Sequence, residues 1–371
     1  MVFTLNHACL PNLIEVDAHK ESFDWGMHYL RAFAIVCILL EHLWWYIGLY
    51  EEARAYLHGS SIYFLFISGY LCQHLSSRRP SSAKTYYRRK IENVISPYLM
   101  WSLLTILFVW ITGQTRIGVI SPDKICWANL PRILLLGWAQ GPYWYIPFVS
   151  GLFLISPLLT RIGDARMLHV FLIFFALAIC IPIRPWSEEF VPYVLRYSYF
   201  GWSFFLGFLY ARFKRRIDPF LNLYVGPALV LGILLGLRLL QPDWFTFGYP
   251  SYDFPEPDSI AFILGGSLAQ SLQKLFFLVP AVSLANHFSR KHIVVLDWLA
   301  TYSFSLYFTH HFFVQDFVRL QKWLFTVLEP GPLVILPLQL GLSVLFIAFN
   351  LVLAMVLKKL FGRWSRRFIG A

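Results

Sequence analysis

The residues best suited to chemistry are Arg31 and His42, which stand eleven positions apart in the apolar segment MHYLRAFAIVCILLEHLWWYIGLY, residues 27–50. Eleven residues make close to three helical turns, so both side chains are expected on one helix face, about 16 Å apart along the axis. Charged groups in a membrane core are costly and usually face a cavity or the bundle interior. In a structural alternative, Arg31 reaches the lipid headgroups and His42 bonds a neighbouring helix.

Two more segments carry polar groups beside apolar ones. Ser68 and Gly69 interrupt the helix predicted from GSSIYFLFISGYL, residues 59–71, where they permit close approach of a ligand or, equally, of another helix. The run Arg88, Arg89 and Lys90 precedes the next apolar span. Such a cluster suits a polyphosphate or an anionic lipid, although it is also typical of a simple topology signal.

A fourth segment, TYSFSLYFTHH at residues 301–311, ends in two adjacent histidines. Neighbouring residues on a helix point about 100° apart, so at most one of His310 and His311 is expected to share a face with a given partner. No acidic residue or cysteine lies near them in the sequence, and the five cysteines form no close pairs. The sequence therefore predicts no metal site and no disulfide framework.

The composition is that of an integral membrane protein. Hydrophobic residues make up 58% of the 371 residues, charged residues only 14%, and the mean hydropathy is +0.58. The net charge of +11 does not indicate nucleic acid, because the basic residues cluster between apolar spans, as expected of loops that face anionic lipid.

With about 20 residues per span, the sequence predicts a bundle of ten transmembrane helices near 28–50, 58–76, 95–112, 143–160, 168–183, 195–211, 220–241, 259–285, 294–316 and 333–357. More than half of the 31 Lys and Arg residues fall in loops on one side and in the final segment. The positive-inside rule therefore places both termini in the cytoplasm. We expect a cytoplasmic segment at 1–27, one membrane domain at 28–357 and a basic cytoplasmic tail at 358–371.

Five segments, in the expected order, resemble motifs of the membrane-bound acyltransferase-3 family, mostly bacterial O-acyltransferases of surface carbohydrates. They are LRAFAIVCILLEH (30–42), FLFISGYL (64–71), RRKIENVISPYLMW (88–101), GPYWYIPFVSGLFLISPLL (141–159) and YSFSLYFTHHFF (302–313). The chain departs from the family pattern at Ser60, where glycine is usual, at Leu65, where phenylalanine is usual, and at Glu92 and Asn93, which are commonly basic. From this sequence we expect a member without the C-terminal esterase-like domain that some members carry.

The resemblance implies an all-α polytopic acyltransferase in the bacterial cytoplasmic (inner) membrane. It implies transfer of an acyl group, with acetyl as the default, from cytoplasmic acyl-CoA to a hydroxyl of a cell-surface glycan or its lipid-linked precursor. The expected partners are acyl-CoA, that acceptor and membrane lipids, with no nucleic acid and no bound cofactor. The acceptor and the oligomeric state stay open.

The resemblance also assigns roles to residues. His42 is expected to act as a general base or to carry the acyl group briefly, since imidazole suits either role near neutral pH. Arg31 with Arg88, Arg89 and Lys90 would hold the CoA phosphates, and Ser68 and Gly69 would admit the pantetheine arm. Residues expected at the acceptor or in support of the site are Glu41, Trp144, Tyr145, Tyr307 and His310. Glu41 lies about 100° around the helix from His42 and is not expected to orient that imidazole.

Other classes of protein fit the composition as well. A transporter, or a flippase for a lipid-linked substrate, would use Arg31 and His42 as a proton or ion relay. Paired discontinuous helices in two matching halves would favour a transporter, and the sequence has no such repeat. A non-catalytic receptor or assembly factor is the third possibility, and acyl-CoA turnover by purified protein separates the enzyme from both.

Overall fold

The computed structural model describes residues 23–45, 57, 59–78, 80–113, 120–180, 190–221 and 260–371. The helices are α2 (Trp25–Trp45), α4 (Ser61–Arg78), α5 (Ala83–Lys90), α6 (Ser96–Thr112), α7 (Leu130–Leu136), α8 (Tyr145–Leu159), α9 (Asp164–Cys180), α10 (Phe190–Ile217), α13 (Ile260–Phe288), α14 (Val294–Leu328), α15 (Pro332–Phe361) and α16 (Ser365–Phe368). A π-helical segment, Ile91–Ile95, joins α5 to α6, and short 3-10 turns occur at Pro122–Lys124, Gly141–Trp144 and Gly362–Trp364.

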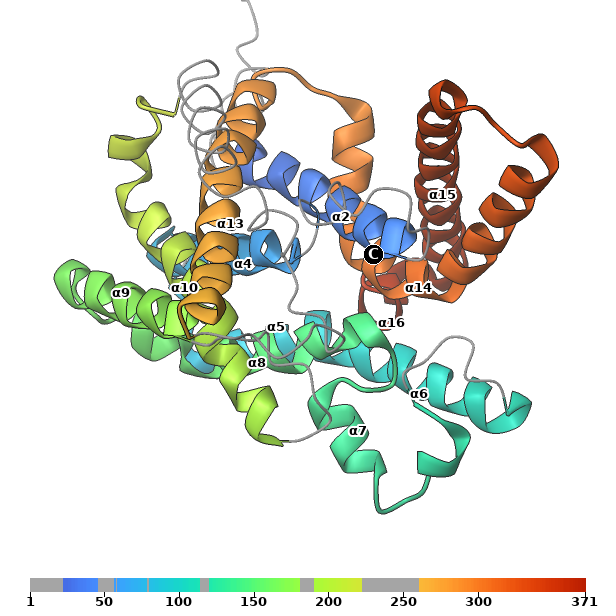
Figure 1. Ribbon diagram of the computed structural model, residues 1–371. Helices are drawn as coiled ribbons and strands as arrows, with labels where there is room; N and C mark the ends of the chain where they lie inside the picture. The colour runs from blue at the N-terminus through green and yellow to red at the C-terminus, as the bar shows by residue number, and fades with distance from the viewer. Residues whose placement is uncertain are drawn as a thin grey trace, which may run out of the picture.

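The prediction of an all-α protein is confirmed, since the described part of the chain contains helices and no strands (Figure 1). Nine of the ten predicted spans coincide with a described helix. Of the remaining one, 220–241, all residues after 221 lie outside the described residues. Four described helical segments are long and apolar enough to cross a membrane: Trp25–Trp44, Ala83–Thr112, Gly141–Leu159 and Val334–Phe368. The count of ten spans and the side of each terminus stay predictions.

Helix α2 lies inside the bundle, where it contacts α4, α13 and α14 (Figure 1). Its apolar side chains are buried on more than one face, as Leu30, Ala32, Ile35 and Leu39 are all fully buried. A helix that is apolar all round is stable only when other helices surround it. The packing therefore holds Arg31 and His42 on one continuous, central helix.

Helices α4 and α10 pack with their backbones in close contact. A Cβ atom at Gly69 would overlap the carbonyl oxygen of Phe204, and one at Gly207 would overlap that of Phe66. Small residues at such a crossing are how membrane helices achieve close van der Waals packing. The Ser-Gly pair of the second span thus sits at a helix crossing.

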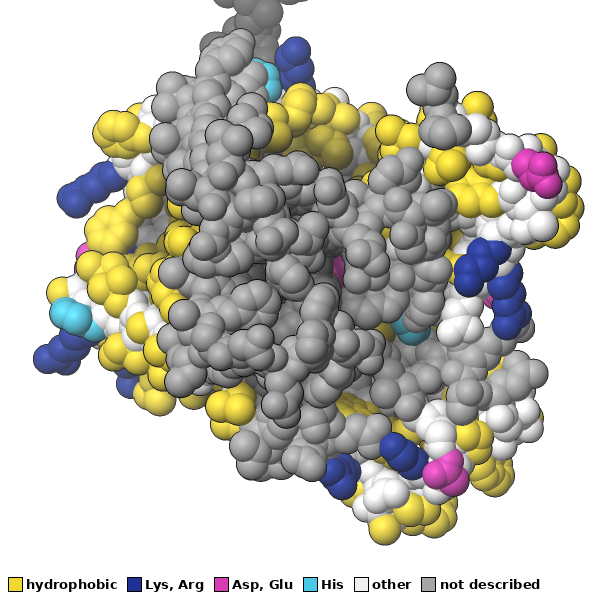
Figure 2. All heavy atoms as spheres, in the orientation of Figure 1, with side chains coloured by type: hydrophobic (Ala, Val, Ile, Leu, Met, Phe, Trp, Pro, Cys, Tyr) yellow, Lys and Arg dark blue, Asp and Glu magenta, His cyan; other side chains and the backbone are white. Residues whose placement is uncertain are grey.

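The outer helices present apolar side chains outward. Figure 2 shows hydrophobic side chains gathered at the margins of the view, beside the residues that are not described. On α15 the exposed large apolar residues are Val334, Leu336, Leu340, Val344, Leu345, Phe349, Val352, Val356 and Leu360. An apolar surface of this extent is expected to face lipid, because in water it would favour aggregation.

The basic entry to the third predicted span forms one continuous helical segment with it, Ala83–Thr112. Ser82 Oγ accepts a hydrogen bond from the Thr85 N–H at 3.3 Å and caps α5. The helix then passes through the π-helical turns of Ile91–Ile95 just before Pro97. Proline lacks an N–H donor, and a widened turn accommodates that loss without ending the helix.

The C-terminal residues fold back onto the bundle. After α15, the short helix α16 contacts α6, and Ile369 is fully buried. Arg367 pairs with Glu92 at 3.0 Å, which ties this end of the chain to the π-helical segment. The basic tail predicted at 358–371 is therefore a packed element in the structure.

Candidate active site

Three histidine side chains meet where the C-terminal turn of α2 lies against α14. The ring centroid of His42 is 5.2 Å from that of His310 and 5.6 Å from that of His311. His310 is fully buried and His311 is 8% exposed, whereas His42 is partly buried. One ring nitrogen from each residue lies within 4.8 Å of the other two. We refer to these three residues as the histidine cluster.

The expectation that only one of His310 and His311 shares a face with a given partner is wrong. Both rings contact His42, and their own centroids are 6.0 Å apart. The three centroid separations are similar, so the rings form a triangle in which each contacts the other two, although adjacent side chains leave a helix about 100° apart. The angle between adjacent side chains is a property of α14 alone, and it does not predict where α2 lies against α14.

Glu41, the neighbour of His42, holds the start of α4. Its Oε1 accepts a hydrogen bond from the Gly59 N–H at 3.1 Å, and its Oε2 accepts one from the Ser60 N–H at 3.4 Å. The carboxylate is 93% buried and lies at a helix N-terminus, where backbone N–H groups and the helix dipole favour a negative charge. These contacts join the Glu41 carboxylate to the start of α4, and the expectation that Glu41 does not orient the His42 imidazole stays a prediction.

At the other end of the α2 face, Arg31 lies among cations and a tyrosine. It is within electrostatic range of Tyr145, Lys90 and Arg366. Among the described residues, none of the three cations forms an ion pair with a carboxylate. Lys90 instead lies over the ring of Phe153, with 3.5 Å from Nζ to the centroid. Arg31 and Lys90 are partly buried, whereas Arg366 is exposed. Such a cluster of cations, with no carboxylate partner among the described residues, suits an anionic ligand.

Aromatic and hydroxyl side chains connect the Arg31 end to the histidine cluster. The hydroxyls of Ser68 and Tyr145 are 3.3 Å apart, and the ring of Tyr145 lies 6.0 Å from that of Tyr307. The ring of Tyr307 lies in turn 6.3 Å from that of His310. A continuous run of side chains therefore connects Arg31 to His42. It consists of four residues that were predicted at the site from sequence: Ser68, Tyr145, Tyr307 and His310.

Contacts from the 3-10 turn Gly141–Trp144 hold this run in place. The Tyr307 hydroxyl donates to the Pro142 carbonyl, and the Tyr143 hydroxyl donates to the Phe308 carbonyl at 3.1 Å. Trp144 is buried and lies 5.4 Å from the guanidinium carbon of Arg196. Its contacts therefore place Trp144 in the packing behind Tyr145.

Two of the predicted donor elements are not brought into this arrangement. The side chain of Arg88 is 75% exposed and lies 3.8 Å from Glu92, while Arg89 is exposed too. Successive helical residues diverge, so that only Lys90 of the basic run points inward. Gly69 faces the backbone of α10, where a Cβ atom would overlap the carbonyl oxygen of Phe204, so close helix packing accounts for this glycine. Of the Ser-Gly pair, only Ser68 reaches the site.

Sequence reasoning did not select His311 or Arg366 as site residues. His311 was set aside on the helical angle, although its identity as a histidine in an apolar span was a usable signal. Arg366 lies in a basic C-terminal segment, whose charges are explained by the positive-inside rule without any role in a site. Its proximity to Arg31 depends on the chain folding back after α15, which no local pattern predicts.

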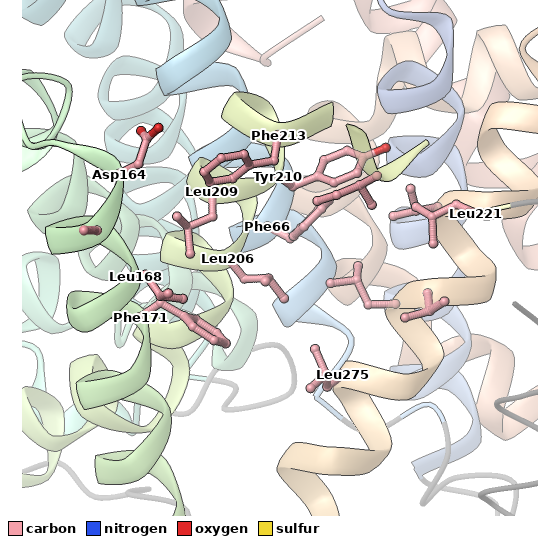
Figure 3. Close-up of a pocket in the computed structure, with 15 residues that line it drawn as sticks. Phe66, Asp164, Leu168, Phe171, Leu206, Leu209, Tyr210, Phe213, Leu221 and Leu275 are labelled. Carbon is pink, nitrogen blue, oxygen red and sulfur yellow. The ribbon is translucent and has the colours of Figure 1, made fainter. Parts of the chain in front are cut away.

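A separate apolar cavity of about 490 Å³ lies among α4, α9, α10 and α13. Figure 3 shows the side chains that surround it, including Phe66, Leu206 and Phe171. Asp164 and Tyr210 are the polar residues at its wall, and none of the histidine cluster lines it. The cavity is therefore distinct from the candidate active site.

Comparison with known proteins matches the chain to one family model. The family model described as an acyltransferase domain of the acyltransferase-3 type matches residues 24–359, which include α2, the run of aromatic residues and the histidine cluster. No curated protein and no solved structure matches the chain. Because the family match covers nearly the whole chain, the protein belongs to the acyltransferase-3 family of membrane acyltransferases.

Proposed function

We propose that this membrane acyltransferase moves an acetyl group from cytoplasmic acetyl-CoA to a hydroxyl of a cell-surface glycan or of its lipid-linked precursor. The observation that carries the proposal is the continuous run of side chains from Arg31 to His42 along one helix face. A CoA thioester has polyphosphate at one end and its reactive carbonyl at the other. The run likewise has cations at the Arg31 end and a candidate base, His42, at the other end.

The cationic end suits the donor's phosphates. Lys90 and Arg366 lie within electrostatic range of Arg31. None of the three forms an ion pair with a carboxylate among the described residues. Arginine offers a planar fork of N–H donors that matches phosphate oxygens. Bound phosphate would therefore gain charge-assisted hydrogen bonds without breaking an existing ion pair.

At the other end, His42 is the proposed general base. Its imidazole takes the proton of the acceptor hydroxyl while that oxygen bonds to the thioester carbonyl carbon. The tetrahedral intermediate then collapses, the carbon–sulfur bond breaks, and the CoA sulfur leaves with the bonding electron pair. The imidazolium of His42 returns the proton to this sulfur.

The test replaces His42 with alanine and measures transfer from radiolabelled acetyl-CoA by purified protein in nanodiscs. Loss of a general base typically costs about 10²–10⁴-fold in rate, so we expect at least a hundredfold loss of transfer with the protein still folded. His169→Ala is the matched control, because His169 is an exposed histidine on α9. It should keep the wild-type rate.

Two results would count against the proposal. Normal transfer by well-folded His42→Ala protein would remove His42 from catalysis. Absence of any acetyl-CoA turnover, together with movement of a lipid-linked substrate or of protons across proteoliposomes, would favour the transporter instead. In the absence of acceptor, label retained on wild-type protein but not on His42→Ala protein would show that His42 carries the acyl group rather than acting as a base.

A further inference from the structure

The histidine cluster offers a set of donor atoms that the proposed reaction does not use in full. General-base catalysis needs one imidazole, yet His42, His310 and His311 bring three together, with one ring nitrogen of each within 4.8 Å of the others. Imidazole is the commonest protein ligand of zinc and related transition metals. We propose that the histidine cluster binds a divalent transition-metal ion of the zinc type, and that this ion inhibits acyl transfer.

The hydrogen bonding of His310 supports metal binding. Its Nδ1 lies 3.1 Å from the Leu306 carbonyl oxygen, to which only a protonated Nδ1 can donate. The lone pair is therefore on Nε2, which is buried and has no hydrogen-bond partner among the described residues. Metal-binding histidines are commonly oriented in this way, with the second ring nitrogen donating to a backbone carbonyl.

His311 supplies a second ring nitrogen that could bind a metal ion and that has no hydrogen-bond partner among the described residues. This nitrogen is its Nδ1, which is buried. Unpaired polar atoms are uncommon in a packed interior, because burying them without a partner is costly. Two such nitrogens, on rings that both contact His42, indicate a ligand in common.

The geometry is close to that of a metal site but wider. Zinc binds histidine nitrogen at about 2.0–2.1 Å, which places two tetrahedral ligand atoms about 3.3 Å apart. The cluster, with separations up to 4.8 Å, needs only modest side-chain rotation to reach this distance. Three neutral ligands in a site that must contract favour reversible occupancy rather than a permanently bound cofactor.

Metal binding and base catalysis compete for the same electron pair. A metal ion bound to His42 occupies the ring nitrogen lone pair that would take the proton of the acceptor hydroxyl. The metal-bound protein is therefore the inactive form. This consequence rests on the proposed function, whereas the binding of the ion does not.

The first experiment measures metal binding without any acyl transfer. Wild-type protein in nanodiscs, stripped with a chelator, is titrated with Zn²⁺ by calorimetry and then assayed for metal content after gel filtration. We expect one Zn²⁺ per chain, and an affinity at least about 100-fold lower in His310→Ala and in His311→Ala, since even outer-shell changes cost about 10–100-fold. His169→Ala should bind as the wild type does, and Mg²⁺, which prefers oxygen ligands, should not bind at this site.

A second measurement needs no substitution and guards against variants that fail to fold. Co²⁺ added to stripped wild-type protein should give the intense visible absorption of a four-coordinate site, and Zn²⁺ should abolish it. The proposal would be overturned if the wild type bound Zn²⁺ no more tightly than His311→Ala. It would also be overturned if the Co²⁺ band did not appear.

The third experiment tests inhibition by comparing each protein with itself. Transfer is measured with added Zn²⁺ and with chelator, and the ratio of the two rates should be far lower for wild type and His169→Ala than for His311→Ala. An equal ratio in all three would overturn the inhibitory role. Metal binding in a protein that shows no transfer at all would instead refute the proposed function and leave the metal site standing.

Discussion

Replacement of Gly69 by alanine should destabilise the protein through the crossing of α4 and α10. The added Cβ would overlap the carbonyl oxygen of Phe204, and a backbone atom cannot rotate aside as a flexible side chain does. Overpacking of a core typically costs about 1–3 kcal/mol, and this contact belongs at the upper end. Alanine regains up to about 1 kcal/mol over glycine inside a helix, so we expect a net loss of about 2 kcal/mol.

The matched control is Gly341→Ala in α15. Gly341 is exposed, lies inside a helix, and has no heavy atom within 4 Å of the position that its Cβ would take. This change should be neutral or stabilise by about 0.4–1 kcal/mol. The assay is reversible unfolding of each purified variant in mixed micelles with increasing denaturing detergent, from which the free energy of unfolding is obtained.

The two variants also separate packing from donor binding at Gly69. Equal free energies of unfolding for Gly69→Ala and Gly341→Ala would refute the close approach of α4 and α10. If Gly69→Ala kept wild-type stability but lost affinity for acetyl-CoA, the glycine would belong to the pantetheine path that its motif suggests. The structure predicts a loss of stability with donor affinity retained in the folded fraction.

Three further predictions concern other parts of the site and the topology. Glu41→Ala should lower the free energy of unfolding by about 1–3 kcal/mol, because it leaves the buried N–H groups at the start of α4 without their carboxylate acceptor, whereas Glu41→Gln, which keeps one acceptor oxygen, should cost less in the same unfolding assay. Arg31→Ala should weaken binding of CoA by about 10–100-fold in calorimetry, since charge-assisted bonds are worth about 1.5–3 kcal/mol, and Arg31→Lys should recover part of the affinity. Lys90→Gln should also weaken CoA binding, whereas Arg88→Gln, at an exposed position, should have a small, salt-sensitive effect. Equal effects at Lys90 and Arg88 would contradict the inward placement of Lys90. Reporter fusions after Ala371 and within residues 78–90 should both read cytoplasmic, and a periplasmic signal from either would refute the predicted topology.

Local patterns predicted the helices and the one-helix pairing well. The apolar spacing of residues 27–50 is enough to place Arg31 and His42 on one face, and α2 is helical throughout. Hydrophobic length and periodicity act within a segment, so a sequence carries them directly. The segments at 143–160 and 168–183, which are short for membrane spans, also form separate helices, α8 and α9.

What the sequence could not supply are contacts between distant segments. His311 joins His42 across more than 260 residues, and its selection required the position of α14 relative to α2. The role of Gly69 likewise could not be predicted from its motif, because a Ser-Gly pair fits a ligand path and a helix crossing equally well. Only the backbone of α10 against it decides between the two.

The arrangement also bears on why the proposed phosphate-binding arginine and the proposed base belong to one helix. Arg31 and His42 are separated by eleven residues of continuous α-helix, about 16 Å along its axis, and α2 is enclosed by α4, α13 and α14. A rigid, buried element fixes that separation, whereas two loops would let it vary with their motion. A donor anchored by its phosphates near Arg31 would therefore present its thioester at a reproducible distance along the run of Tyr145 and Tyr307. Catalysis by positioning requires this kind of fixed spacing, because misplacement by about 1 Å is enough to cost a large part of the rate.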